Sequence, residues 1–163
     1  MDVFRVLLFL HIVAVIVGFG VTFSYPFLQA FAERNGVSAT RFWLRAMQRL
    51  DRMVVYPGAA LVLLFGIGLI FSDHNSFGGD MGEMPGWLTG SIAWYAVVMV
   101  VSVAVVRRDV QDALRVLEGV HVDGSFPAEY LSLSRRIQIV GGLLSVSVLG
   151  IAYLMVWGRE GGF

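Results

Sequence analysis

The sequence predicts an all-α membrane protein, a single domain over residues 1–163 in which four transmembrane helices form a bundle. Hydrophobic residues make up 57% of the chain, above the usual share in globular proteins. Four segments contain no Asp, Glu, Lys or Arg, and each is long enough to cross about 30 Å of hydrocarbon as a helix. None has the polar face of a helix from a soluble bundle. We expect the helices at about residues 4–31, 53–72, 86–106 and 136–158.

Composition excludes several kinds of chemistry. The chain has no cysteine, so disulfides, thiolate catalysis and Cys-ligated metals are excluded. All 12 basic residues are arginine, which excludes a Schiff-base lysine. The sequence contains no phosphate-binding glycine loop, no catalytic Ser–His–Asp set and no pair of carboxylates within the apolar segments. We therefore assign no catalytic residue and no metal ligand.

The arginines predict how the chain threads the membrane. The two connections at 33–52 and 107–135, together with Arg136, contain ten of the twelve arginines, whereas the short connection near 73–83 contains acidic residues and no arginine. Basic connections stay in the cytoplasm, because their translocation is disfavoured. The sequence therefore predicts a bacterial inner-membrane protein with both termini outside and both arginine-rich connections in the cytoplasm.

A secretory signal is the competing interpretation of the N-terminus, with cleavage after Ala30-Phe31-Ala32. The apolar stretch is much longer than the ~7–15 residues of a signal core. Cleavage there would also place the first arginine-rich connection outside, against the charge rule. We therefore expect a retained transmembrane helix.

Both arginine-rich connections are expected to contain helix. Four arginines, Arg41, Arg45, Arg49 and Arg52, recur at spacings of four, four and three, which places them on one helical stripe. This pattern, with Ser38 as its N-cap, predicts an interfacial helix lying on an anionic leaflet. The stretch "RRDVQDALRVLEG" has apolar residues at helical spacing, and Gly119 is its expected stop.

The sequence suggests an internal duplication. At an offset of 83 residues, "LDRMVVYPG" (Leu50–Gly58) lies over "LSRRIQIVG" (Leu133–Gly141), and His11 lies opposite Trp94. Each half would be one helical hairpin. This predicts a 2+2 parallel repeat about an axis along the membrane normal.

His11 is the one ionisable residue inside an apolar segment. On a helix it shares a face with Gly18, Thr22 and Tyr25, which is typical of a side that packs on protein rather than lipid. Small residues at Gly58 and on the fourth helix offer matching grooves. A hydrogen bond to Tyr95 would satisfy the imidazole structurally. Neutral histidine is also a good haem ligand, and an intramembrane ionisable group is by default a candidate functional site.

A second histidine ligand for His11 is missing, because His74 and His121 lie in connections on opposite sides of the membrane. The acidic connection could in principle bind a metal through carboxylate, imidazole and thioether groups. Their spacing matches no metal-binding template, and a solvated loop is the preferred interpretation. The residues concerned are Asp73, His74, Asp80, Met81, Glu83 and Met84.

The segment "LLFLHIVAVIVGFGVTFSYP" (Leu7–Pro26) resembles the opening helix of the bacterial family called domain of unknown function 2269, predicted integral membrane proteins. The resemblance covers the four-helix architecture and the early histidine. More distantly, the Leu-His pair is similar to HemJ-type protoporphyrinogen oxidases and copper-resistance D-type proteins. In the HemJ type the first-helix histidine binds haem and a later lysine is essential; this chain has His11 and no lysine.

Two classes of function follow. The first is a non-enzymatic four-helix bundle acting as an oligomer or as an accessory subunit of a membrane complex. The alternative is a haem-binding redox or porphyrin-handling protein, with His11 as axial ligand of haem b and Tyr95 beside it. A carrier or channel built on the duplication is a third reading, which no polar pore-lining set supports. The expected partner is the lipid bilayer, and nucleic acid is not expected, because the arginines have aromatic neighbours that indicate lipid.

Overall fold

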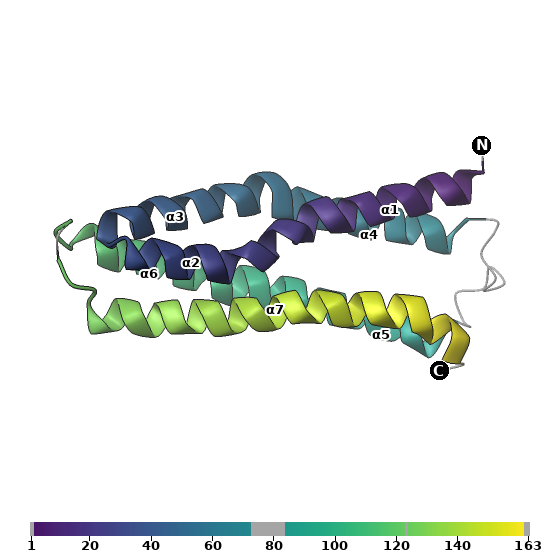
Figure 1. The fold of residues 1–163 in the computed structure, drawn as a ribbon. Helices are drawn as coiled ribbons and strands as arrows, with labels where there is room; N and C mark the ends of the chain where they lie inside the picture. The colour runs from purple at the N-terminus through teal and green to yellow at the C-terminus, as the bar shows by residue number, and fades with distance from the viewer. Residues whose placement is uncertain (1, 73–83, 123, 162–163) are drawn as a thin grey trace.

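The computed structural model describes residues 2–72, 84–122 and 124–161, and within them the chain is a bundle of four long helices without strands (Figure 1). Each of the four is long and apolar enough to cross a membrane. The predicted all-α polytopic fold class is therefore confirmed.

Three of the four long helices are built from consecutive segments. The first consists of α1 (Val3–Gly20), the 3₁₀ segment η1 (Val21–Ser24) and α2 (Tyr25–Arg34). The second consists of α3 (Val37–Leu50), the π-helical segment η2 (Asp51–Val55) and α4 (Tyr56–Ile70). The third consists of α5 (Gly86–Val101), the π-helical segment η4 (Ser102–Val106) and α6 (Arg107–Glu118). The fourth is α7 (Ala128–Gly161).

Two prolines account for two of the irregular segments. Pro26 follows η1 and Pro57 follows η2, each near the start of the next α-helical segment. Proline has no N–H, and its ring clashes with the carbonyl four residues earlier. Those carbonyls belong to Thr22 and Met53, which lie inside the irregular segments. The departures from α-helix therefore fall where proline requires them, whereas η4 has no proline to explain it.

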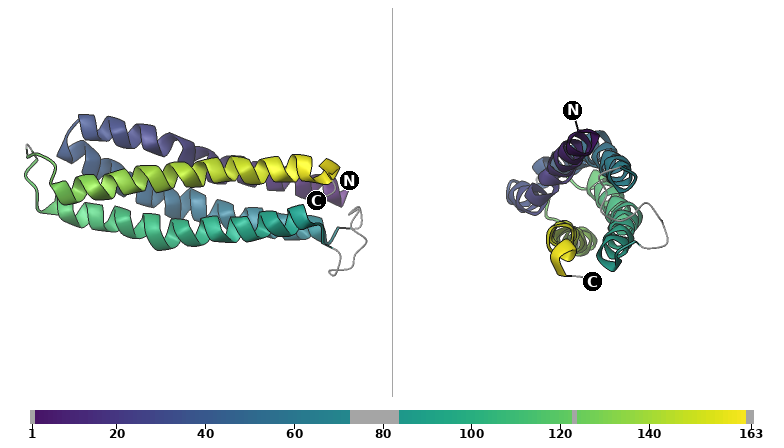
Figure 2. Two further views of the ribbon diagram at one scale, coloured as in Figure 1. Left: turned by 90° about the horizontal axis from the view of Figure 1, so that it is seen from below. Right: turned by 90° about the vertical axis from the view of Figure 1, so that its right-hand side faces the viewer.

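Both chain ends lie at one end of the bundle, which we call the terminal end (Figures 1 and 2). The opposite end, formed by α2, α3, α6 and the first half of α7, holds nine of the arginines, with Arg52 in the adjoining η2, and is called the arginine-rich end. Toward the terminal end α1 packs on α4, and α5 packs on α7. Toward the arginine-rich end α2, α3, α6 and α7 pack together as one four-helix core.

The α1–α4 contact depends on two glycines. A Cβ built on Gly58 would lie 2.5 Å from the Cα of Gly18, closer than real atoms approach. Both residues are buried. The predicted small-residue contact between the first and second helices is therefore confirmed, and it is of the kind that membrane helices use to approach closely.

The predicted interfacial helix forms, but its predicted location was wrong. It is α3, which continues the second long helix and buries Trp43, Leu44 and Met47 in the arginine-rich core instead of lying on a leaflet. Its buried face is covered by α2 and α6, whereas Phe42 on the same helix stays 76% exposed. Gly36, with φ 91°, occupies the N-cap position predicted for Ser38. The helix predicted before Gly119 is confirmed as α6.

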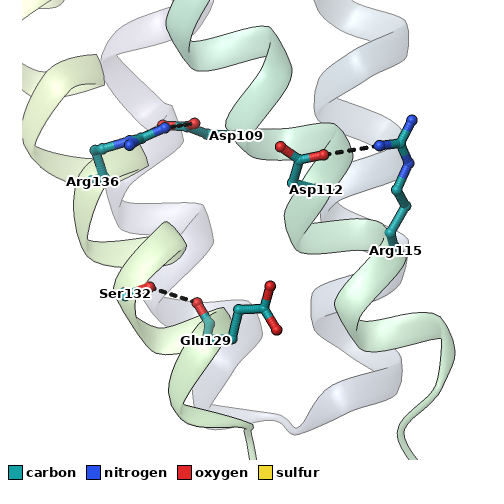
Figure 3. Close-up of polar contacts among 6 residues, drawn as sticks. All are labelled: Asp109, Asp112, Arg115, Glu129, Ser132 and Arg136. Carbon is teal, nitrogen blue, oxygen red and sulfur yellow. Dashed lines mark hydrogen bonds and ion pairs between the residues drawn. The ribbon is translucent and has the colours of Figure 1, made fainter.

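Charged groups also join the helices of the arginine-rich end. Arg41 donates from Nε to the Leu117 carbonyl at 2.9 Å and so caps the last turn of α6. Arg136 on α7 forms a two-pronged ion pair with Asp109 on α6, a carboxylate that is 1% exposed (Figure 3). The neighbouring Asp112–Arg115 pair, at 3.0 Å, stays within α6.

Two structural parallels support the predicted duplication. The His11 ring lies against Gly66, and the Trp94 ring lies against Gly150. The offsets are 94 − 11 = 83 and 150 − 66 = 84, close to the sequence register. In addition, the first and third long helices become irregular at corresponding heights, in η1 and η4. The duplication itself stays a prediction.

Candidate functional site

His11 lies in the contact between α1 and α4 and is 8% exposed. Its Nδ1 is 3.0 Å from the Val62 carbonyl oxygen. A carbonyl can only accept, so Nδ1 carries the proton and donates it. Gly66 leaves space for the ring, because a Cβ there would lie 3.3 Å from Cε1. The histidine therefore holds two transmembrane helices together through one side-chain-to-backbone hydrogen bond.

Tyr95, the second candidate residue, also bonds to α4. Its hydroxyl donates to the Ala59 carbonyl at 2.7 Å, and its ring meets the Phe19 ring edge-on at 6.3 Å. The predicted Tyr95–His11 hydrogen bond was therefore wrong, since each side chain donates to its own backbone carbonyl. His11 on α1 and Tyr95 on α5 thus bond to carbonyls of α4 that are three residues apart. Their role as cofactor ligands stays a prediction.

The other metal or histidine candidates do not converge on this region. His121 is exposed in the α6–α7 connection. Asp73, His74, Asp80, Met81 and Glu83 lie outside the described residues. Among the residues that the structure does describe, no group of three or more His, Cys, Asp or Glu could hold a metal ion.

A cavity of about 70 Å³ lies between the four long helices, near their middle. Each of the three irregular segments contributes to its wall. Departures from α-helical bonding of this kind are frequent at functional sites. Most of the lining is apolar, and the polar side chains on it are Thr22, Tyr25, Asp51, Ser102, Gln138 and Ser145.

Asp51 is the only carboxylate on the cavity wall. Its Oδ1 accepts a hydrogen bond of 3.0 Å from the hydroxyl of Tyr25, which is 8% exposed. The Tyr25 ring in turn meets Trp43 edge-on at 5.6 Å. No arginine in the described ranges forms an ion pair with Asp51. The cavity thus contains a negative charge without a protein counter-charge in contact.

Four of the five donor side chains on the cavity wall, all except Ser102, donate within the protein. Thr22 donates to the Phe19 carbonyl at 2.7 Å, and Ser145 donates to the Gly141 carbonyl at 3.0 Å. Gln138 directs its amide N–H groups to Glu33 at 3.4 Å and to the Ser134 hydroxyl at 3.2 Å. The lone pairs of these oxygens remain, so the small polar part of the cavity wall consists mainly of hydrogen-bond acceptors.

A second polar cluster adjoins the cavity through Gln138. Glu33 Oε1 accepts hydrogen bonds from Gln29 Nε2 at 2.9 Å, from the Tyr130 hydroxyl at 2.7 Å and from Ser134. Gln29, Tyr130 and Ser134 are all at most 3% exposed. Gln29 Oε1 has no hydrogen-bond partner among the described residues. A carboxylate at the arginine-rich end is thus enclosed by donors from two helices.

The sequence reasoning missed these groups because it counted Glu33 and Asp51 as charges of a solvated connection. A usable signal was present on the first and fourth helices. Polar residues recur every four positions as Tyr25, Gln29 and Glu33, and again as Tyr130, Ser134 and Gln138. Such spacing places each set on one helical face. Two polar stripes of equal length at adjoining helix ends predict a buried network.

Four long apolar helices around a cavity with a few polar side chains define a small polytopic helical membrane protein. The chain belongs to the family described as predicted integral membrane protein (DUF2269), which matches residues 5–158. This confirms the resemblance seen in the first helix. Comparison with curated proteins and with solved structures gave no match. The more distant similarity to HemJ-type and copper-resistance D-type proteins stays a prediction.

Proposed function

We propose that this protein is a non-enzymatic membrane subunit that works by associating with another transmembrane helix. The other helix belongs either to a second copy or to a larger membrane complex in which the chain is an accessory subunit. We place it in a bacterial inner membrane, with both termini outside and the arginine-rich end in the cytoplasm. The distribution of the arginines supports this orientation.

The observation that supports association is an uncovered small-residue face on α5. The residues of this face, spaced by four and three and all exposed, are Gly86, Gly90, Ala93, Val97 and Val100. A Cβ built on Gly90 meets nothing within 4 Å. By contrast, the exposed residues of α7 include bulky Leu143, Val146 and Leu149.

Helix faces made of small residues promote association in lipid, because no hydrophobic force drives apolar helices together there. Association depends on close packing, which Gly and Ala permit and larger side chains prevent. The protein already uses such a contact internally, where Gly18 meets Gly58. The α5 face offers the same type of surface to a helix from outside the bundle.

The contacts of His11 support a structural role over haem ligation. The bond from Nδ1 to the Val62 carbonyl leaves Nε2 as the ring nitrogen that a metal could use, but the imidazole is only 8% exposed, and the two helices that enclose it approach closely at Gly18 and Gly58. Haem ligation remains the second candidate function and is tested separately below.

The chain has no cysteine, so a single introduced cysteine can be labelled cleanly. A photoreactive maleimide on Ala93→Cys in native membranes should form a cross-linked product after illumination. The matched control is Val146→Cys, at a position 64% exposed on α7, which should form little product. Gly90→Leu added to Ala93→Cys should abolish the product, because leucine prevents close approach.

The mass of the product distinguishes the two forms of association. A product of about twice 17.9 kDa indicates a second copy. A product of another size indicates an accessory subunit, whose partner can then be sequenced. Equal yields from Ala93→Cys and Val146→Cys, or no product from either, would reject the proposal.

A further inference from the structure

We propose that the cavity between the four helices binds a small monovalent cation, with Asp51 as its counter-charge. The occupant is either an alkali ion or an ammonium-type ion, since both are recognised by oxygen acceptors beside a negative charge. This inference does not depend on self-association, because none of the cavity residues belongs to the α5 face.

The first step concerns the positions of the irregular helical segments. The segments η1, η2 and η4 come from three different helices, yet Thr22, Asp51 and Ser102 from these segments all line one cavity. A π-helical segment shifts the backbone bonding pattern and re-aims side chains. Pro26 and Pro57 account for η1 and η2, whereas η4 has no proline, and all three segments contribute residues to one cavity, which is the arrangement expected of a built site.

The second step concerns the polarity of the wall. Thr22, Tyr25 and Ser145 each give their hydroxyl proton to a protein acceptor. What they present to the cavity is therefore lone pairs. Gln138, with its amide hydrogens donated to Ser134 and Glu33, likewise keeps its carbonyl oxygen as an acceptor. A polar part made mainly of acceptors favours a cation or a donor-rich ligand and disfavours an anion.

The third step concerns charge. Asp51 is the single carboxylate on the wall, and Arg52 within η2 and Arg107 directly after η4 are exposed instead of paired with it. An isolated charge among helices that span a membrane is costly without a partner. One carboxylate balances one monovalent ion. A divalent metal is disfavoured, because the described residues provide no cluster of three metal-binding groups.

The fourth step concerns size. A water molecule needs roughly 10–15 Å³ of cavity measured in this way, so about 70 Å³ accommodates a small ion with a few waters. The Phe19 and Tyr25 rings on the wall would attract an ammonium ion through their faces. Larger cations such as N-methyl-D-glucamine do not fit.

The test measures the melting temperature of the purified protein in lipid nanodiscs against added NaCl, KCl, ammonium chloride or methylammonium chloride. Ionic strength is held constant with N-methyl-D-glucamine chloride. At least one of these salts should raise the melting temperature in a saturable way. Tryptophan emission should change over the same concentration range, because Trp43 contacts the Tyr25 ring.

Asp51→Asn should raise the half-saturating concentration at least tenfold. Asp112→Asn is the matched control, since that carboxylate pairs with Arg115 on the surface of α6, and it should respond as the unaltered protein does. No saturable effect of any small cation in the unaltered protein, or equal responses of the two variants, would overturn the proposal.

A second variant keeps the test decisive if Asp51→Asn does not fold. Ser145→Ala retains the charge and removes one cavity oxygen, so it should bind several-fold more weakly. Unchanged half-saturation in Ser145→Ala would count against the site. A response to Na⁺ or K⁺ alone identifies an alkali-ion site, whereas a response confined to ammonium and methylammonium identifies an amine site.

Discussion

At the scale of single residues, His11 has a titratable side chain, yet it forms an ordinary side-chain-to-backbone hydrogen bond. Its Nδ1–H donates to the Val62 carbonyl inside the α1–α4 contact. Interhelical hydrogen bonds of this type in membranes contribute about 0.6 kcal/mol on average and at most about 1.7 kcal/mol. The residue is therefore expected to align the helices more than to stabilise them strongly.

His11→Ala should accordingly lower the free energy of unfolding by about 1 kcal/mol. The unaltered protein, purified in mild detergent, should show no Soret band before or after dithionite. Unfolding in mixed micelles and an absorption spectrum check both statements. A Soret band that sharpens on reduction and disappears in His11→Ala would instead establish haem ligation and replace the structural interpretation.

Gly58→Ala should destabilise the protein, because the new methyl would overlap Gly18 at 2.5 Å. Overpacking a close contact costs about 1–3 kcal/mol. The matched variant is Gly20→Ala, where the added Cβ meets nothing within 4 Å. Melting temperatures measured side by side should fall only for Gly58→Ala, and similar falls for both would show that the close contact is unimportant.

At the level of single residues, the sequence predicted which helical face is buried but did not predict which groups the buried side chains hydrogen-bond. The helical face of His11 and Gly18 was predictable, because a period of 3.6 residues follows from the sequence alone. The hydrogen bonds from His11 to Val62 and from Tyr95 to Ala59 were not predictable, because their acceptors are backbone carbonyls, which every residue has. Only the rotation and depth of α4 select which carbonyl is reached, and neither is encoded in a local pattern.

At the scale of elements, α3 shows what an amphipathic pattern does and does not determine. The pattern indicates that one helical face is covered, but a leaflet and a neighbouring helix satisfy it equally. In the structure that face buries Leu44 and Met47 against protein. The choice between a leaflet and a neighbouring helix depends on whether α2 and α6 extend as far as α3. That information comes only from the tertiary structure.

The α6–α7 contact gives an element-scale prediction. Arg136→Gln removes the partner of Asp109, which is 1% exposed and would be left buried with its charge uncompensated. Arg135→Gln, at the exposed neighbouring position, is the control. Thermal unfolding should show a clearly lower melting temperature for Arg136→Gln alone. Equal melting temperatures would mean that the ion pair does not hold these helices together.

At the scale of the whole molecule, the four long helices were predictable because charge-free apolar runs of this length have few other stable states. The length of the helices was not, since charged residues continue each of them beyond the apolar run. The cavity could not be predicted from the sequence either. Its polar residues come from all four long helices, and only the assembled bundle brings Thr22, Asp51 and Ser145 together.

Orientation gives the whole-molecule prediction. Single cysteines at Val3, 68% exposed near the terminal end, and at Ser125, exposed at the arginine-rich end, report opposite sides of the membrane. An impermeant maleimide added to spheroplasts should label Val3→Cys at once and Ser125→Cys only after lysis. The reverse order would invert the proposed topology, and labelling of both before lysis would contradict a single fixed orientation.

The length of the helices has a further electrical consequence. The second long helix has 34 residues, about 51 Å at roughly 1.5 Å per residue, against about 30 Å of hydrocarbon. Arg41 then stands about 16 Å farther along it than Arg52, well beyond the ~8 Å screening length of physiological salt. We therefore expect Arg52 to lie within the surface potential of the lipid, whereas Arg41, which caps α6, should stand beyond the range of that potential. One stripe of arginines is then expected to span two electrostatic environments, the near part close to the bilayer and the far part beyond its screening length.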